Sequence, residues 1–174
     1  CAEENGIDAE LKRLESALDC GLRLVQVRDK TLPAAERERF ATEVVTRVRA
    51  HPGARVLIND DAALAVRLGA DGVHYSSNRL MALDERPDFA LIAASCHCEA
   101  ELAHAAKLGL DFVVFGPVQA TRTHPEATPL GWAEFARRID DLPLPAYALG
   151  GLTPDDLDIA RTHGAHGIAL MRGW

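Results

Sequence analysis

The feature that most constrains the fold is a regular alternation of short apolar segments with longer amphipathic segments along the 174 residues. The short segments are typical of buried β-strands, and the longer ones carry apolar residues at helical spacing, as Leu11, Leu14 and Leu18 do. Strict alternation of strands and helices predicts a parallel sheet with right-handed crossovers. The predicted strands are 22–27, 55–58, 70–74, 89–94, 112–115, 146–149 and 167–171, and the predicted helices are 7–20, a helix beginning at 32, 61–68, a short turn near 80, 99–108, 132–139 and 153–162.

Two closures of such a sheet are compatible with the pattern, an open doubly wound sheet and a (β/α)₈ barrel. A barrel needs eight strands, and seven are predicted. The chain begins in what reads as a strand-to-helix loop and stops at the end of a strand. We therefore expect 1–174 to form one α/β domain of a longer polypeptide, in which a strand before Cys1 and a helix after Trp174 complete the barrel.

Composition excludes several classes of protein. Hydrophobic residues make up 48% and charged residues 26%, which is typical of a soluble globular protein. The formal charge of −7 argues against a general nucleic-acid binder, which would be basic, but allows a local cationic pocket. No apolar run approaches the roughly 18 residues of a membrane span, and the four cysteines do not resemble a disulfide framework. We expect a cytoplasmic protein without nucleic-acid or membrane partners.

The segment from Gly116 to Gly131 is much longer than the usual strand-to-helix connection of about 2–6 residues. It contains three threonines and Arg122, and hydroxyl and guanidinium groups suit an oxyanion such as phosphate. The alternative is a solvent-exposed loop rich in proline and threonine. The segment is therefore a candidate phosphate site.

Polar residues recur at or just after the carboxyl ends of the predicted strands. In a barrel that end carries the active site. Each position also has a simpler interpretation: a solvated charge cluster at 28–30, a helix cap at 59–60, and a plain turn at 150–151, where paired glycines could instead form a phosphate nest. The full set is Gln26, Arg28, Lys30, Asn59, Asp60, His74, Ser95, His97, Thr121, Arg122, Thr123, Gly150 and Gly151.

The run Cys96-His97-Cys98 has the residue types of a metal site. A structural zinc needs about four ligands in spaced pairs, and no second pair accompanies this run. We therefore do not predict zinc here. His124, His163 and His166 are expected to be surface or loop residues.

Taken in order, eight motifs resemble the thiamine-phosphate synthase and TenI superfamily, and together they cover nearly the whole chain. They are Q-V-R-D-K (26–30), I-N-D (58–60), G-A-D-G-V-H (69–74), A-S-C-H (94–97), G-P-V-x-x-T-R-T (116–123), P-L-G-W (129–132), A-L-G-G-L (148–152) and G-I-A-L-M (167–171). The resemblance implies a TIM barrel. The details A-S-C-H, H-G-A-H-G-I-A and R-G-W are most similar to synthase-like domains fused behind a Nudix (MutT-type) hydrolase in some bacteria.

The resemblance implies a transferase of thiamine biosynthesis, which joins hydroxymethylpyrimidine diphosphate to a thiazole phosphate and releases pyrophosphate. Its partners would be these phosphorylated small molecules, with Mg²⁺ as cofactor. The implied roles are pyrimidine diphosphate and pyrophosphate binding for Gln26, Arg28, Lys30 and Asn59, Mg²⁺ binding for Asp60, a place near the pyrophosphate for Ser95, and thiazole phosphate binding for Thr121, Arg122, Thr123, Gly150 and Gly151.

Besides Arg122, which stands where the family commonly has lysine, two positions depart from the family pattern. Arg79 stands where the family has a second Mg²⁺-binding aspartate, and a cation there would repel the metal. Arg172 stands where the synthases commonly have a phosphate-binding serine, although an arginine could also hold phosphate. The first departure weakens the expectation of Mg²⁺ and of synthase activity.

Two further functions are therefore considered. One is a TenI-type thiazole tautomerase, which needs no Mg²⁺ and would use His97 as acid and base, since histidine can titrate near neutral pH. The other is a non-catalytic domain that binds a phosphate ligand and is attached to a Nudix hydrolase. The sequence leaves a homodimer as an open option.

Overall fold

The computed structural model describes residues 6–29, 31–121 and 127–171. The chain divides into two compact units, Cys1–His74 with Phe89–Leu91, and Tyr75–Asp88 with Ile92–Trp174. Within each unit the strands follow one another in the sheet in chain order, and the paired strands are parallel. The predicted parallel α/β class is confirmed.

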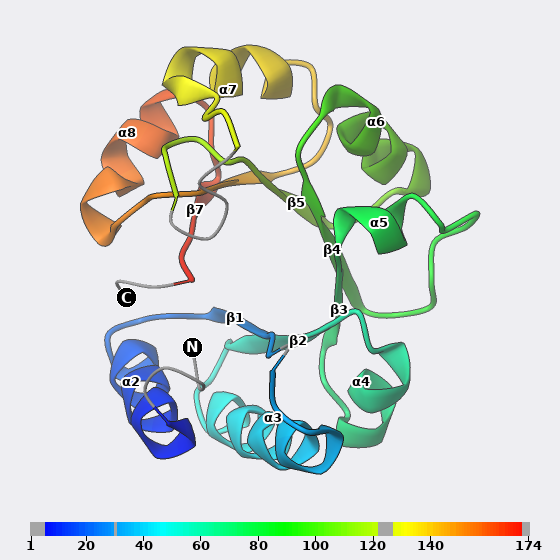
Figure 1. Ribbon diagram of the computed structural model, residues 1–174, viewed down its shortest axis with the longest axis vertical. Helices are drawn as coiled ribbons and strands as arrows, with labels where there is room; N and C mark the ends of the chain where they lie inside the picture. Colours follow the sequence, from blue (N-terminus) through cyan, green and yellow to red (C-terminus); the bar gives the residue numbers. More distant parts are fainter. Residues whose placement is uncertain (1–5, 30, 122–126, 172–174) are drawn as a thin grey trace. The chain divides into compact units, whose positions relative to one another are not determined.

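The first unit contains three helices in the described residues, and these cover the strands on one side (Figure 1). Its elements are α2 (Ile7–Asp19), β1 (Leu24–Val27), α3 (Ala34–Arg49), β2 (Arg55–Asn59), α4 (Ala62–Leu68) and β3 (Gly72–Tyr75), of which Tyr75 belongs to the second unit.

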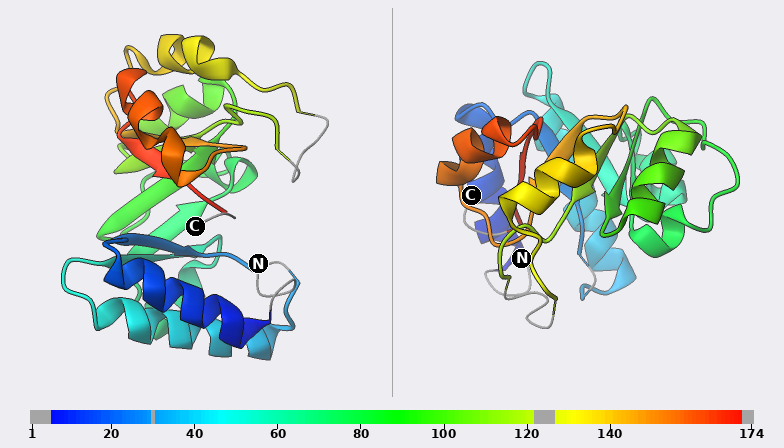
Figure 2. Two further views of the ribbon diagram at one scale, coloured as in Figure 1. Left: turned by 90° about the vertical axis from the view of Figure 1, so that its left-hand side faces the viewer. Right: turned by 90° about the horizontal axis from the view of Figure 1, so that it is seen from above.

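The core of the first unit follows from the apolar spacing of its helices. Leu14 and Leu18 of α2 are buried, as are Val44 and Val48 of α3, and the two helices lie side by side (Figure 2). On β2 the segment 56–58 is buried throughout, as is typical of a strand in a parallel sheet. Burial of these side chains contributes about 1.5–3 kcal/mol each.

The second unit continues the same alternation of helix and strand. Figure 1 shows helices α6, α7 and α8 outside its strands. The elements are α5 (Ser77–Leu80), β4 (Leu91–Cys96, with Leu91 in the first unit), α6 (Glu99–Leu108), β5 (Phe112–Phe115), α7 (Gly131–Ile139), β6 (Ala146–Leu149), the 3₁₀ turn η1 (Pro154–Asp156), α8 (Leu157–Thr162) and β7 (Gly167–Ala169).

The core of the second unit is built on β5. All four residues of this strand are buried, and the ring of Phe115 lies 5.7 Å from that of Phe135 on α7, measured between centroids. Aromatic pairs at this separation contribute about 0.5–1.5 kcal/mol beyond their buried area. The packing of β5 against α7 therefore fixes the positions at which the loops before and after β5 join the strand.

Helix ends coincide with capping residues that the sequence displays. The Oδ1 atom of Asp61 accepts a hydrogen bond from the backbone N–H of Leu64 at 2.9 Å and begins α4, and Gly69 ends it in the left-handed conformation. Gly109 ends α6 in the same way. Thr153 and Asp156 form a capping box at η1, so the predicted helix start is confirmed, with a 3₁₀ first turn.

Some boundaries were predicted wrongly. β4 was expected at 89–94 but is Leu91–Cys96, because it pairs with β5 in a register that sets Cys96 opposite Phe115. β1 begins two residues later than predicted, and β7 ends at Ala169. Pro33 is the residue before α3 rather than part of its first turn.

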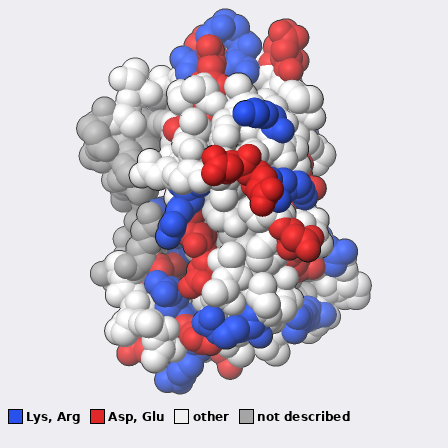
Figure 3. All heavy atoms as spheres, turned by 90° about the vertical axis from the view of Figure 1, so that its right-hand side faces the viewer, with Lys and Arg blue, Asp and Glu red and all other residues white. Residues whose placement is uncertain are grey.

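Surface properties agree with the composition. Figure 3 shows acidic and basic side chains interspersed over one face, so neither sign of charge gathers there as it would for a polyanion site. In the described part of the chain no helix combines the length and apolar character needed to cross a bilayer. Cys20, Cys96 and Cys98 are free thiols.

Candidate active site

The carboxyl end of β1 carries the first predicted ligands of the diphosphate. Gln26 lies in β1 opposite Leu57 of β2, and Arg28 follows directly after the strand. Both side chains are exposed to solvent. Lys30 lies outside the described residues. The structure thus places an amide and a guanidinium where the sequence predicts them, in the first unit.

Asp29, between them, has a role that the sequence did not reveal. Its carboxylate is buried and accepts hydrogen bonds from the backbone N–H groups of Thr31 and Leu32 and from the Thr31 hydroxyl, at 2.8–2.9 Å. Burial acts to raise the pKa of Asp29, but these bonds outweigh it and lower the pKa. Asp29 therefore holds the segment that leads into α3, and the interpretation of 28–30 as a solvated charge cluster is wrong for this residue.

Asn59 and Asp60 converge on one backbone carbonyl at the end of β3. The side-chain amide of Asn59 and the backbone N–H of Asp60 each donate to the carbonyl oxygen of His74 at 3.0 Å. Asp60 has a φ of 55°, the only positive value at a non-glycine residue in the described ranges. Such a conformation costs about 1–2 kcal/mol and concentrates at functional sites.

The capping interpretation of residues 59–60 is wrong, because the residue that caps α4 is Asp61. The strained backbone of Asp60 is therefore not explained by the start of the helix. Its position at the end of β2 is the one that the sequence predicts for a metal-binding carboxylate.

His74 is buried beside these residues, with 1% of its surface exposed. Burial lowers its pKa to about 4; the charge of Asp60 acts to raise the pKa and that of Arg28 to lower it. The imidazole is consequently neutral at pH 7.

In the second unit, β4 ends in the run that resembled a metal site. Ser95 is half-buried inside the strand, opposite Val114 of β5. Burial raises the pKa of the neighbouring Cys96 to about 12, with smaller contributions from Glu101 and Cys98. A thiol that stays protonated is a poor nucleophile.

His97 is tied to the loop that follows β5. Its Nδ1 atom lies 2.7 Å from the carbonyl oxygen of Gly116, and its backbone N–H donates to Glu101 Oε2 at 2.5 Å. A carbonyl can only accept, so Nδ1 carries a proton in this contact. In the neutral ring Nε2 is then the accepting nitrogen, which is the arrangement of an oriented general base.

The loop 116–131 has a closed neck. The backbone N–H groups of Leu130 and Gly131 donate to the carbonyls of Pro117 and Val118 at 2.9 Å, so the two ends of the loop lie together. Val118 N–H also donates to Leu149 O at 2.8 Å, which joins the neck to β6. Thr121 is half-buried on this loop. Arg122 and Thr123 lie outside the described residues, as does Arg172.

Gly150 and Gly151 follow β6 with φ values of 106° and 70°, which favour glycine. Neither position has room for a side chain. A Cβ at 150 would stand 2.6 Å from Pro117 Cα, and one at 151 would stand 2.4 Å from the carbonyl oxygen of Ala120. Glycine is therefore required by both conformation and space, and the pair lies directly against the loop neck.

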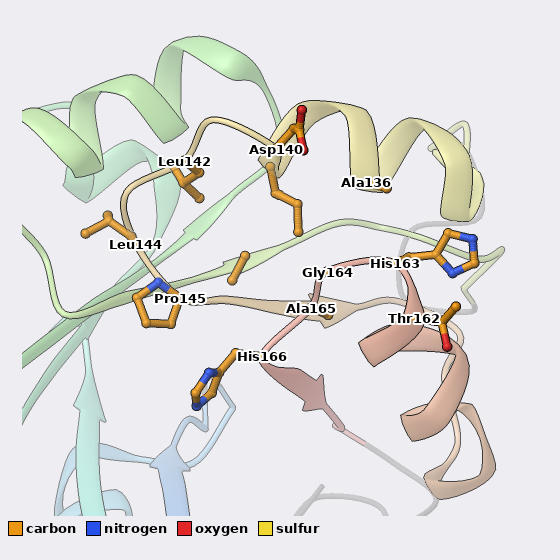
Figure 4. Close-up of a pocket in the computed structure, with 12 residues that line it drawn as sticks. Ala136, Asp140, Leu142, Leu144, Pro145, Thr162, His163, Gly164, Ala165 and His166 are labelled. Carbon is orange, nitrogen blue, oxygen red and sulfur yellow. The ribbon is translucent and has the colours of Figure 1, made fainter.

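The second unit also has a cavity of about 650 Å³ that is separate from these residues (Figure 4). Its lining includes Ala146, the first residue of β6, and His166, which precedes β7. It is therefore at the amino ends of the strands, whereas Gly150 is at a carboxyl end. His163 is half-buried and stacks on Trp132, and His166 is exposed, as predicted for loop histidines.

Two residues that no sequence motif singled out lie beside the glycine pair and the loop neck. The side-chain amide of Gln119, on the loop neck, donates to Asp156 Oδ1 in η1 at 3.0 Å. Gln119 occupies an unassigned position of the G-P-V-x-x-T-R-T motif, and Asp156 lies at the start of the helix predicted over 153–162. No local pattern links residues 37 positions apart.

Comparison with known proteins decides the family. A family model described as thiamine monophosphate synthase matches residues 1–174. The chain belongs to this family. A thiamine-phosphate synthase of Chromobacterium violaceum is 39% identical to it over 176 residues, which is 95% of this chain and 82% of the relative. A thiamine-phosphate synthase of Thioalkalivibrio sulfidiphilus is 34% identical over 165 residues, covering 92% and 78%.

A solved structure supports the fold of the family. The thiamine phosphate pyrophosphorylase of Pyrococcus furiosus matches 92% of this chain and 78% of its own, with a TM-score of 0.78 and 23% sequence identity. At this identity the likeness is evidence for the fold alone. It confirms the TIM-barrel type of fold that the motifs predict for this thiamine monophosphate synthase family member.

Proposed function

We propose that this chain is a thiamine-phosphate synthase, which joins hydroxymethylpyrimidine diphosphate to a thiazole phosphate and releases pyrophosphate. The observation that carries the proposal is the family match over 1–174, with motif residues at the carboxyl ends of strands. Arg28, Asn59 and Asp60 stand at such ends in the first unit, and Gly150 and Gly151 follow β6 in the second.

The chemistry is a dissociative substitution. The C–O bond between the pyrimidine methylene and the diphosphate breaks, and both electrons leave with pyrophosphate. The thiazole nitrogen then donates its lone pair to the resulting cation. Catalysis requires stabilisation of the leaving negative charge. We assign this role to the guanidinium of Arg28 and the amides of Gln26 and Asn59.

Mg²⁺ fits the residues present if most of its ligands come from the diphosphate and water. Mg²⁺ commonly takes one or two carboxylates together with substrate phosphates. Asp60 would hold it from its position directly after β2. Among the described residues there is no group of three or more His, Cys, Asp and Glu side chains placed for a metal. When bound, Mg²⁺ would neutralise part of the diphosphate charge.

The test is formation of thiamine phosphate and pyrophosphate from the two substrates with Mg²⁺. Arg28→Met should lower kcat/KM about 100-fold, because a charge-assisted contact to the leaving group is lost. The matched control is Arg55→Met, at the amino end of β2, which should stay within about twofold. A parent protein that forms no thiamine phosphate at saturating substrates would refute the proposal.

A TenI-type thiazole tautomerase is the second candidate, and the contact of His97 favours it. With Nδ1 donating to Gly116 O, Nε2 is oriented as a base that could take a proton from the thiazole and return it elsewhere on the ring. His97→Asn is the informative variant, because an asparagine amide can keep the bond to Gly116 while removing the base.

The two enzymes are separated by solvent isotope exchange. A tautomerase incorporates deuterium from D₂O into the thiazole carboxylate phosphate, and His97→Asn should abolish the incorporation. A synthase forms thiamine phosphate without such exchange. A protein that binds the phosphates without either reaction would instead be a ligand-binding domain.

We also propose the wider setting that the sequence indicates, a cytoplasmic protein with a Nudix hydrolase in the same polypeptide. The motifs A-S-C-H and H-G-A-H-G-I-A support this proposal. The reading frame upstream of Cys1 tests it directly. A homodimer is a separate proposal, which light scattering of the purified protein tests by giving its mass in solution.

A further inference from the structure

Gln119 lies where the loop after β5 meets the glycine pair after β6. We propose that Gln119 is a positioning residue for the thiazole phosphate, which holds the backbone of Gly150 and Gly151 through its hydrogen bond to Asp156. The proposal rests on the proposed function, because it assumes that these glycines meet that phosphate. It assigns a role to a position that the family resemblance left unassigned.

The backbone of Gln119 is packed directly against the glycine pair. Its N–H donates to the carbonyl oxygen of Gly150 at 3.0 Å. A Cβ at 151 would stand 2.9 Å from the Cβ of Gln119, closer than real side chains approach. Gln119 therefore borders the phosphate-facing backbone on one side.

The side chain of Gln119 reaches past the glycines to the start of η1. Its Nε2 donates to Asp156 Oδ1 at 3.0 Å, while Asp156 Oδ2 accepts from the backbone N–H of Thr153 at 2.7 Å and from its hydroxyl at 3.1 Å. The bond from the Thr153 backbone is the main cause that lowers the pKa of Asp156; the side-chain bonds also lower it, and burial opposes them. Asp156 is thus a carboxylate, and its bond to Gln119 is charge-assisted.

These contacts enclose the segment 150–153 between two anchors, the loop neck and the capping box. The segment needs such anchors, because two successive glycines have the greatest backbone freedom of any residues. A phosphate that binds a disordered backbone must order it, and this ordering costs free energy and lowers affinity. A backbone that is already ordered does not impose this cost. The Gln119–Asp156 bond therefore acts on phosphate affinity rather than on the chemical step.

The first experiment measures both substrates for Gln119→Leu, which removes the donor at similar size. We expect KM for the thiazole phosphate to rise about tenfold, with kcat and KM for the pyrimidine diphosphate within about twofold. Thr162→Ala is the control, since it removes a hydroxyl that donates to the carbonyl oxygen of Asp158 within α8, away from both anchors. It should leave all three constants within about twofold.

The second experiment exchanges donor and acceptor. Gln119→Glu places a second carboxylate against Asp156, and it should raise KM for the thiazole phosphate more than Gln119→Leu does. In the double variant Gln119→Glu with Asp156→Asn, an amide can donate to a carboxylate again while the asparagine oxygen still caps Thr153. We expect this variant to return to within about threefold of the parent. If Gln119 only stabilised the fold, the double variant would not restore KM for the thiazole phosphate alone.

Three outcomes would overturn the proposal: an unchanged KM in Gln119→Leu, an equal rise for both substrates, or no rescue by the exchanged pair. Calorimetry with the thiazole phosphate alone separates this proposal from the synthase assignment. If the parent binds it but forms no thiamine phosphate, the affinity of the variants tests Gln119 and the synthase function fails. If the parent does not bind it, the role of Gln119 is refuted.

Discussion

The burial of His74 makes the stability of the first unit depend on pH in a direction that can be tested. Burial holds the pKa of this histidine at about 4, below its ordinary value of 6.5. Between these values the unfolded chain binds a proton that the folded chain excludes. Stability is therefore complete above pH 6.5 and is lost as the pH falls from 6.5 towards 4.

The size of the effect follows from the difference between the two pKa values. A difference of about 2.5 corresponds to about 3 kcal/mol of unfolding free energy, at about 1.4 kcal/mol for each pKa unit. That is a large part of the roughly 5–15 kcal/mol that stabilises a typical domain. The ring is 1% exposed, so solvent screens little of this contribution.

The assay is urea unfolding of the parent and of His74→Gln at intervals from pH 4 to pH 7.5. The two curves should converge as the pH falls, and the difference between them should change by up to about 3 kcal/mol. His166→Gln, which removes an exposed histidine, is the control and should run parallel to the parent. Parallel curves for the parent and His74→Gln would refute the reasoning.

Three further predictions concern other parts of the chain. The imidazole of His51 contacts the backbone carbonyl of Arg47 and the carboxylate of Asp19, and both contacts raise its pKa, the first more than the second. The stabilisation from His51 is therefore complete below pH 6.5 and is lost as the pH rises through the pKa of the folded state. Asp19→Asn should reduce this loss, measured by urea unfolding. Gly72→Ala should cost about 3 kcal/mol or more in thermal unfolding, because its Cβ would stand 1.6 Å from a backbone carbonyl oxygen. Arg79→Asp should strengthen Mg²⁺ binding, measured by calorimetry with pyrophosphate, because it replaces a repelling cation with an oxygen ligand; weaker binding would contradict the assignment of this position.

The elements predicted best are those whose signals are local. Helix α6 and strand β5 have the predicted bounds, and α4 ends at its predicted capping residue, Gly69. Apolar spacing and the C-terminal glycine act within one or two turns of chain, so the sequence displays them directly. β4 was displaced by two residues because a strand of uniform apolar character has no internal mark of its register.

The candidate site was predicted less completely than the fold. The order of motifs indicated Arg28, Asn59 and Asp60, and the structure places them at strand ends. It did not distinguish Asp60 from Asp61 as the helix cap. That distinction depends on the backbone angles at the end of β2, which the pairing with β3 determines.

The sequence by itself determined the parallel α/β class, the family and the strand ends that carry polar residues. Periodicity and capping depend on residues close together in the chain, and the order of the motifs can be read along it. The burial of His74 and the link between Gln119 and Asp156 were decided only by the tertiary structure. Each depends on which groups surround a side chain in space. Desolvation and hydrogen bonding between distant segments arise only when the strands are packed together.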